Sequence, residues 1–107
     1  MGLTELNFEF KPSSPKTLID DWSHIGVVSS GDLEVLIERD DKFAGKAKIH
    51  ILTTVVGFDN VWETVLGRII EKNGLSGVLI SINDNAATPA VVNRRLQQAI
   101  ANGGGLQ

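Results

Sequence analysis

The sequence predicts an α+β fold, a two-layer sandwich in which two helices pack on one face of a mainly antiparallel sheet. Several segments alternate apolar and polar residues with the period of two that is typical of a half-buried strand. Two later segments repeat apolar residues with the helical period. The chain has 107 residues, so we expect one domain over 1–107 with a frayed tail at about 102–107.

Four segments show the strand pattern: 5–10, 33–38, 46–51 and 78–82. We interpret the second and third of these as an antiparallel hairpin whose polar tip is 39–45. The segment 17–24 instead places Leu18, Ile19 and Trp22 on one side of a short helical turn.

The two predicted helices have recognisable ends. Asp59 or Asn60 can cap the first, with Glu63 completing a capping box after Asn60, and Gly74 ends it. The second begins at 88–89, a capping threonine followed by a proline at the first helical position. The apolar stripes are Val61, Trp62, Val65, Leu66, Ile69 and Ile70, then Val91, Val92, Leu96, Ala99 and Ile100, with Arg94, Arg95, Gln97 and Gln98 outside the second stripe.

Composition excludes several classes of function. The net charge of −3 gives little support to nucleic-acid binding, which normally needs a basic face. No apolar run approaches the roughly 20 residues that cross a bilayer, and the N-terminus lacks an apolar signal core. We therefore expect a cytoplasmic protein. Cysteine is absent, so any thioester chemistry has to use the thiol of a cofactor.

The residue inventory is poor in catalytic constellations. His24 and His50 are far apart and belong to no ligand-spaced cluster, and the acidic pairs 20–21 and 40–41 lie in polar loops. Trp62 lies on a helical stripe and is expected in the core. The sequence therefore predicts a non-catalytic protein without a metal site.

One segment, 27–36, places two hydroxyls at a glycine-containing turn between apolar strands. Ser29, Ser30, Gly31 and Asp32 are all favoured in turns for backbone reasons alone, which is the simpler interpretation. The functional interpretation is an exposed serine that accepts a covalent group. Asp32 could then orient the serine hydroxyl, which without a base is a weak nucleophile.

This segment resembles the attachment site of the malonate decarboxylase acyl carrier proteins, the delta subunits, a family related to the citrate lyase acyl carrier (gamma) subunits. The matching residues are 26–36 (GVVSSGDLEVL), 53–55, 62–66, 83–84 and 87–89. The likeness runs from about residue 6 to residue 100. Ser29 stands where that family usually has glycine, so both serines remain candidates.

The resemblance implies a carrier, hence a phosphoprotein of malonate catabolism, whose Ser30 holds 2'-(5''-phosphoribosyl)-3'-dephospho-CoA through a phosphodiester, with Ser29 as second choice and Gly31 and Asp32 beside it. The thiol of that group would carry acetyl and malonyl thioesters while malonate is converted to acetate and CO2. The implied partners are the acetyl-to-malonyl transferase and decarboxylase subunits, the prosthetic-group transferase and a malonyl transferase. The alternatives are a citrate lyase carrier and an unmodified protein-binding module.

Overall fold

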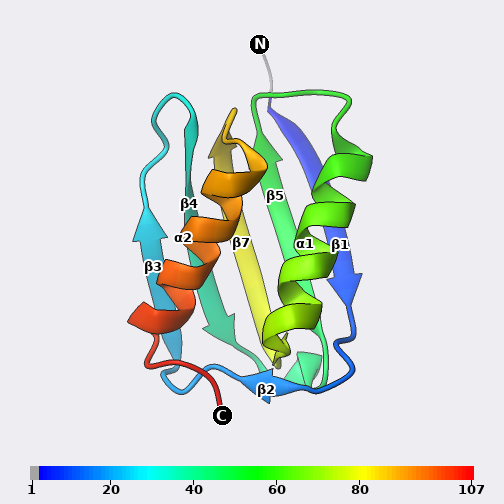
Figure 1. Cartoon of the computed structure of the whole chain (residues 1–107), viewed down its shortest axis with the longest axis vertical. Coiled ribbons are helices and arrows are strands. Elements are labelled where there is room, and N and C mark those ends of the chain that lie inside the picture. The colour runs from blue at the N-terminus through cyan, green and yellow to red at the C-terminus, as the bar shows by residue number, and fades with distance from the viewer. Residues whose placement is uncertain (1–2) are drawn as a thin grey trace.

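The computed structural model describes residues 3–107 and has the predicted α+β architecture. Figure 1 shows both helices lying side by side on the same face of one five-stranded sheet. The strands are β1 (Thr4–Phe10), β2 (Lys16–Thr17), β3 (Trp22–Gly26), β4 (Asp32–Arg39), β5 (Ala47–Thr53), β6 (Leu75–Ser76) and β7 (Val78–Asn85), and the helices are α1 (Asp59–Asn73) and α2 (Pro89–Asn102), with a short 3-10 turn at Asp41–Phe43.

The order of the strands corrects one prediction. The main sheet runs β1-β5-β7-β4-β3, and β2 pairs separately with β6. Strands β4 and β5 do not form a hairpin, because β7 lies between them, antiparallel to β4 and parallel to β5. The two ends of the β4–β5 connection are both hydrogen-bonded to Gly77, the residue before β7. The Asp40 N–H donates to the Gly77 carbonyl, and the Gly77 N–H donates to the Lys46 carbonyl. Alternation shows which face of a strand is buried, not which strand lies beside it.

The core lies between the sheet and the helices. Alternate residues of β4, β5 and β7 point toward the helices and are buried. From α1 and α2 the buried residues are Trp62, Leu66, Ile69, Ile70, Val92, Leu96, Ala99 and Ile100. This set confirms most of both predicted stripes, although Val61 is 44% exposed.

Two of the three predicted helix ends agree with the structure, and one differs. The C-cap Gly74 of α1 has φ 74°, and Thr88 accepts a hydrogen bond from the Val91 N–H at the start of α2, ahead of Pro89. The start of α1 was wrongly predicted, because its N-cap is Phe58 and no side chain caps the helix. Both expected capping residues therefore lie inside the first turn.

The predicted helical turn at 17–24 is wrong. This segment holds the end of β2, a bend at 19–21 and the start of β3. The Thr17 N–H donates to the Gln107 carbonyl, the Thr17 carbonyl accepts from the Gln107 N–H, and the Ile19 N–H donates to the Gly105 carbonyl. Leu18 is fully buried. The tail that we expected to fray is thus hydrogen-bonded to the chain. Within residues 3–107, no helix has the length and apolar character needed to cross a membrane.

Candidate functional site

The serine turn lies at the end of the sheet where α1 and α2 begin (Figure 1). It joins β3 to β4 and is closed by a hydrogen bond from the Asp32 N–H to the Ser29 carbonyl at 2.9 Å. The Gly31 N–H donates to the Asn85 carbonyl of β7 at 2.7 Å. Gly31 has φ 76°, a left-handed conformation that favours glycine. The turn is therefore fixed to the sheet, while its tip points outward.

Both serines are exposed, as the functional interpretation requires. A Cβ placed on Gly31 would meet no heavy atom within 4 Å, so the space beside Ser30 is open. The preceding Val27 and Val28 are 55% and 50% exposed, so two apolar side chains lie on the surface just before the serines in the chain. The turn is therefore accessible from solvent.

Asp32 makes different contacts from those expected. Its carboxylate accepts from the Arg95 Nε at 2.9 Å and the Arg95 Nη2 at 2.5 Å, and from the Leu33 N–H at 2.7 Å. The hydrogen bonds from Arg95, together with the one from Leu33, lower the pKa of Asp32 from 3.8 to about 2. Arg95, which the periodicity placed outside, is half-buried. Asp32 thus anchors β4 to α2. The partners of its carboxylate in these hydrogen bonds are Arg95 and Leu33, not a serine hydroxyl.

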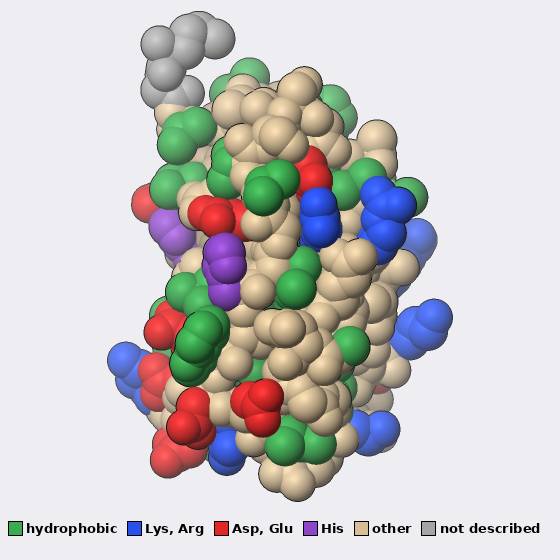
Figure 2. All heavy atoms as spheres, turned by 90° about the vertical axis from the view of Figure 1, so that its left-hand side faces the viewer, with side chains coloured by type: hydrophobic (Ala, Val, Ile, Leu, Met, Phe, Trp, Pro, Cys, Tyr) green, Lys and Arg blue, Asp and Glu red, His purple; other side chains and the backbone are tan. Residues whose placement is uncertain are grey.

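The two histidines lie apart on the open face of the sheet. His24 contacts the Glu34 carboxylate at 2.9 Å, and His50 contacts the Glu5 carboxylate at 2.8 Å. The Asn83 amide also donates to Glu34 and, with His24, lowers the pKa of this carboxyl. Figure 2 shows the β3 side of the molecule, with acidic side chains mainly toward the left of the view and most Lys and Arg side chains toward the right. Among residues 3–107, no group of acidic or histidine side chains has the arrangement of a metal site.

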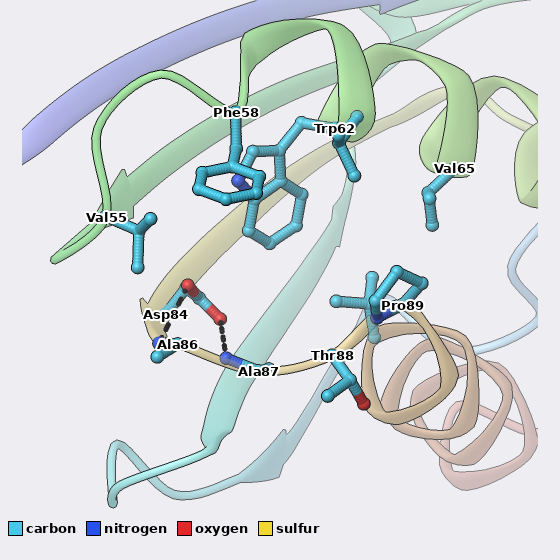
Figure 3. A pocket seen from close by; sticks show the side chains of 11 residues that line it. Val55, Phe58, Trp62, Val65, Asp84, Ala86, Ala87, Thr88 and Pro89 are labelled. Carbon is cyan, nitrogen blue, oxygen red and sulfur yellow. Dashed lines mark hydrogen bonds between the residues drawn. The ribbon is translucent and has the colours of Figure 1, made fainter.

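An apolar hollow of about 500 Å³ lies between the starts of α1 and α2 (Figure 3). Its lining residues come from the β5–α1 loop, α1, the end of β7 and the start of α2: Val55, Phe58, Val61, Trp62, Val65, Asp84, Ala86, Ala87, Thr88, Pro89 and Val92. Sequence reasoning missed this hollow, because its two lining segments, 55–65 and 84–92, are distant in the chain. The sequence signal that could have pointed to it is the set of residues that resemble the family, 53–55, 62–66, 83–84 and 87–89. Each of these short segments contributes at least one residue to the lining.

One acidic group belongs to the wall of the hollow. Asp84 is 3% exposed, and its carboxylate accepts from the Thr53 hydroxyl at 2.8 Å and from the backbone N–H groups of Ala86 and Ala87 at 3.2 and 3.1 Å. These bonds hold the connection between β7 and α2 in shape. Ala86 has φ 61°, a conformation that the bond to Asp84 supports.

The family model and the similar proteins point to the same family. Residues 21–103 match the family described as malonate decarboxylase delta subunit. The chain is similar to the malonate decarboxylase acyl carrier protein of Malonomonas rubra, with 46% identity over 92% of this chain and 88% of that protein. It is also similar to that of Acinetobacter calcoaceticus, with 41% identity over 92% of this chain and 95% of that protein.

A solved structure shares the fold. A chain in the crystal structure of a Pseudomonas malonate decarboxylase hetero-tetramer in complex with malonate is 36% identical, with a TM-score of 0.81, over 94% of this chain and 99% of that one. Family match, near full-length relatives and fold agree, and the chain therefore belongs to the family of malonate decarboxylase delta subunits, the acyl carrier proteins of that enzyme.

Proposed function

We propose that Ser30 is the attachment site of a covalent prosthetic group, phosphoribosyl-dephospho-CoA, in this malonate decarboxylase acyl carrier subunit. The observation that supports this most directly is the outward-pointing turn, in which both serines are exposed. The turn is rigid at its base, through the bonds of Gly31 to Asn85 and of Asp32 to Arg95. A rigid base with an open tip presents a hydroxyl to a modifying enzyme in a defined position.

The residues present fit such a group. A phosphodiester needs a hydroxyl oxygen and free volume, and the turn offers both, since a side-chain atom added at Gly31 would meet nothing. When attached, the group supplies a thiol for acetyl and malonyl thioesters, which this cysteine-free chain lacks. The chain itself provides attachment, and tethering raises the concentration of the thiol at each partner.

The choice of Ser30 over Ser29 rests on its place in the turn. Ser29 lies at the base, where its carbonyl accepts the hydrogen bond from Asp32 that closes the turn. Ser30 directly precedes Gly31, as in the family pattern. Ser29 is the second choice, since its side chain is exposed as well.

The proposed setting is a cytoplasmic complex of several subunits. The similar Pseudomonas chain is part of a hetero-tetramer, which supports other malonate decarboxylase subunits as partners. We propose that these include the acetyl-to-malonyl transferase and the decarboxylase subunits, with separate enzymes that install the group and load malonyl. The family match favours malonate over the citrate lyase carrier.

Intact-mass spectrometry after co-expression with the installing enzyme tests the attachment site. The wild-type chain and Ser29→Ala should gain the mass of the group, whereas Ser30→Ala should not and should keep its fold, because the position is exposed. Peptide mapping locates the modification. If only Ser29→Ala loses the added mass, the attachment site is Ser29 instead of Ser30. If the wild-type chain gains no mass, the carrier proposal fails and an unmodified protein-binding module is the remaining interpretation.

The unmodified chain should release no CO2 from malonate. The described residues offer no metal cluster, and the sequence has no thiol. A continuous CO2 assay should detect turnover only when modified, acetylated carrier is mixed with the other subunits. Steady turnover by the unmodified chain alone would contradict the carrier function.

A further inference from the structure

The apolar hollow begins next to the serine turn. The Gly31 N–H donates to the Asn85 carbonyl at 2.7 Å, and Asn85 is followed at once by Ala86 and Ala87, which line the hollow. A group attached at Ser30 is therefore tethered beside it, across the single connection between β7 and α2. Tethering raises the local concentration of any part of the group that reaches this site.

The lining of the hollow restricts what can occupy it. Figure 3 shows Phe58 and Trp62 on the α1 side, facing Ala87 and Pro89 across the hollow. Its lining is mostly apolar and includes no lysine or arginine. The one charged lining residue, Asp84, already accepts three hydrogen bonds. Phosphate and carboxylate groups would lose hydration here without gaining a cationic side chain as a partner.

Size and shape favour a flat, uncharged ring. The volume of about 500 Å³ is within the range of small-molecule sites. Phe58, which is 49% exposed, provides a ring face on which a nucleobase can stack, and Trp62, which is 7% exposed, forms part of the wall behind it. The hollow thus fits an aromatic base better than a charged or strongly polar group.

We propose that the hollow holds the adenine base of the chain's own prosthetic group, an inference that rests on the proposed function. In phosphoribosyl-dephospho-CoA attached at Ser30, the order from the serine is phosphoribosyl, adenosine, diphosphate and pantetheine. Adenine is therefore the aromatic ring of the group and lies near the attached end. Its binding between α1 and α2 fixes the nucleotide and leaves the pantetheine end free to reach other subunits.

Isotope-filtered NMR on the loaded protein tests this directly. Protein labelled with 13C and 15N and carrying the unlabelled group should show NOEs from the adenine H2 and H8 protons to the Trp62 ring and the Ala87 and Val92 methyls. The Trp62 indole resonance should shift on loading. The Trp22 indole resonance should not, because that side chain is 63% exposed on β3 and does not line the hollow.

A matched pair of variants separates binding from attachment. Ala87→Leu places a larger side chain in the hollow and should gain the same mass as the wild-type chain while losing the adenine NOEs. Ala90→Leu, at an exposed position of α2, should keep both. An amide correlation spectrum shows that each variant is folded.

Each outcome has one meaning. If the wild-type chain gains no mass, the proposed attachment fails and the base has no tether. If it gains mass but the NOEs come from the pantetheine methyls or from no part of the group, the adenine site is overturned. The adenine site is also overturned if Trp62 shifts only when other decarboxylase subunits are added, because a partner side chain then fills the hollow.

Discussion

Asp32 shows how one side chain can support the candidate site without touching the serine hydroxyls. It is the first residue of β4, and its carboxylate holds Arg95 of α2 through two hydrogen bonds. The Arg95 guanidinium also donates to Gln98 on the next turn of α2, which orients it further. The strand that follows the turn is thereby fixed to the helix layer.

This ion pair should make stability depend on pH. The folded pKa of Asp32 is about 2, below its ordinary 3.8, so its stabilising contribution is complete above 3.8 and is lost as the pH falls through about 2. Urea titrations of the wild-type chain and Asp32→Asn should therefore differ in unfolding free energy at neutral pH, and the difference should shrink at about pH 2.5. A difference that does not change with pH would contradict the pairing.

The sequence identifies the turn but not this partner. Serine, glycine and aspartate in succession are local turn signals, and they correctly predicted the chain reversal at 29–32. Arg95 is 63 residues away from Asp32. Helical periodicity gives only the direction in which a side chain leaves the helix, and the long arginine side chain reaches back from the border of the apolar stripe.

At the scale of elements, the sequence was informative wherever the signal was local. Gly74 ends α1 because the left-handed conformation there favours glycine and because a Cβ would lie 2.2 Å from the Ser14 carbonyl oxygen. The prediction for segment 17–24 was wrong because it placed the apolar residues on one side of a helical turn. In the structure Leu18 is buried beside the C-terminal tail, whereas Trp22 begins β3 and is exposed.

The buried stripe of α1 should contribute strongly to stability. Ile69 is 6% exposed and belongs to the core, so Ile69→Ala should lower the unfolding free energy by roughly 2–5 kcal/mol. Val61 on the same helix is 44% exposed, and Val61→Ala should cost about 0.5 kcal/mol or less. Chemical denaturation followed by circular dichroism measures both. Equal effects of the two substitutions would mean that α1 packs with a different face.

At the scale of the whole molecule, the C-terminal tail ties two distant regions together. Gly105, Leu106 and Gln107 run beside Thr17–Ile19, and Leu106 forms a bridge with Leu18. Composition alone could not reveal this docking, because a glycine-rich end has no apolar periodicity. The positive φ values of Gly104 and Gly105 allow the chain to turn back on itself after α2.

Removal of the tail should therefore destabilise the fold. A chain ending at Gly103 loses three backbone hydrogen bonds to Thr17 and Ile19, and its unfolding free energy should fall by roughly 1.5–4 kcal/mol. Leu106→Ala keeps those backbone bonds and should show a smaller loss. Urea titration compares the three chains, and an unchanged midpoint in the truncated one would contradict the docking.

The central position of β7 has a consequence for how the protein is made. β7 is the last strand synthesised, yet it fills the space between β4 and β5. On a ribosome, β1 with β5 and β3 with β4 can pair early, as two half-sheets that each keep an unfinished apolar edge. At about 5–20 residues per second, the 32 residues from Thr53 to Asn85 take roughly 2–6 s. During those seconds the edges of β4 and β5 are open to strands of neighbouring chains. Synthesis of β7 closes both edges at once, and only then can the serine turn form its hydrogen bond to Asn85.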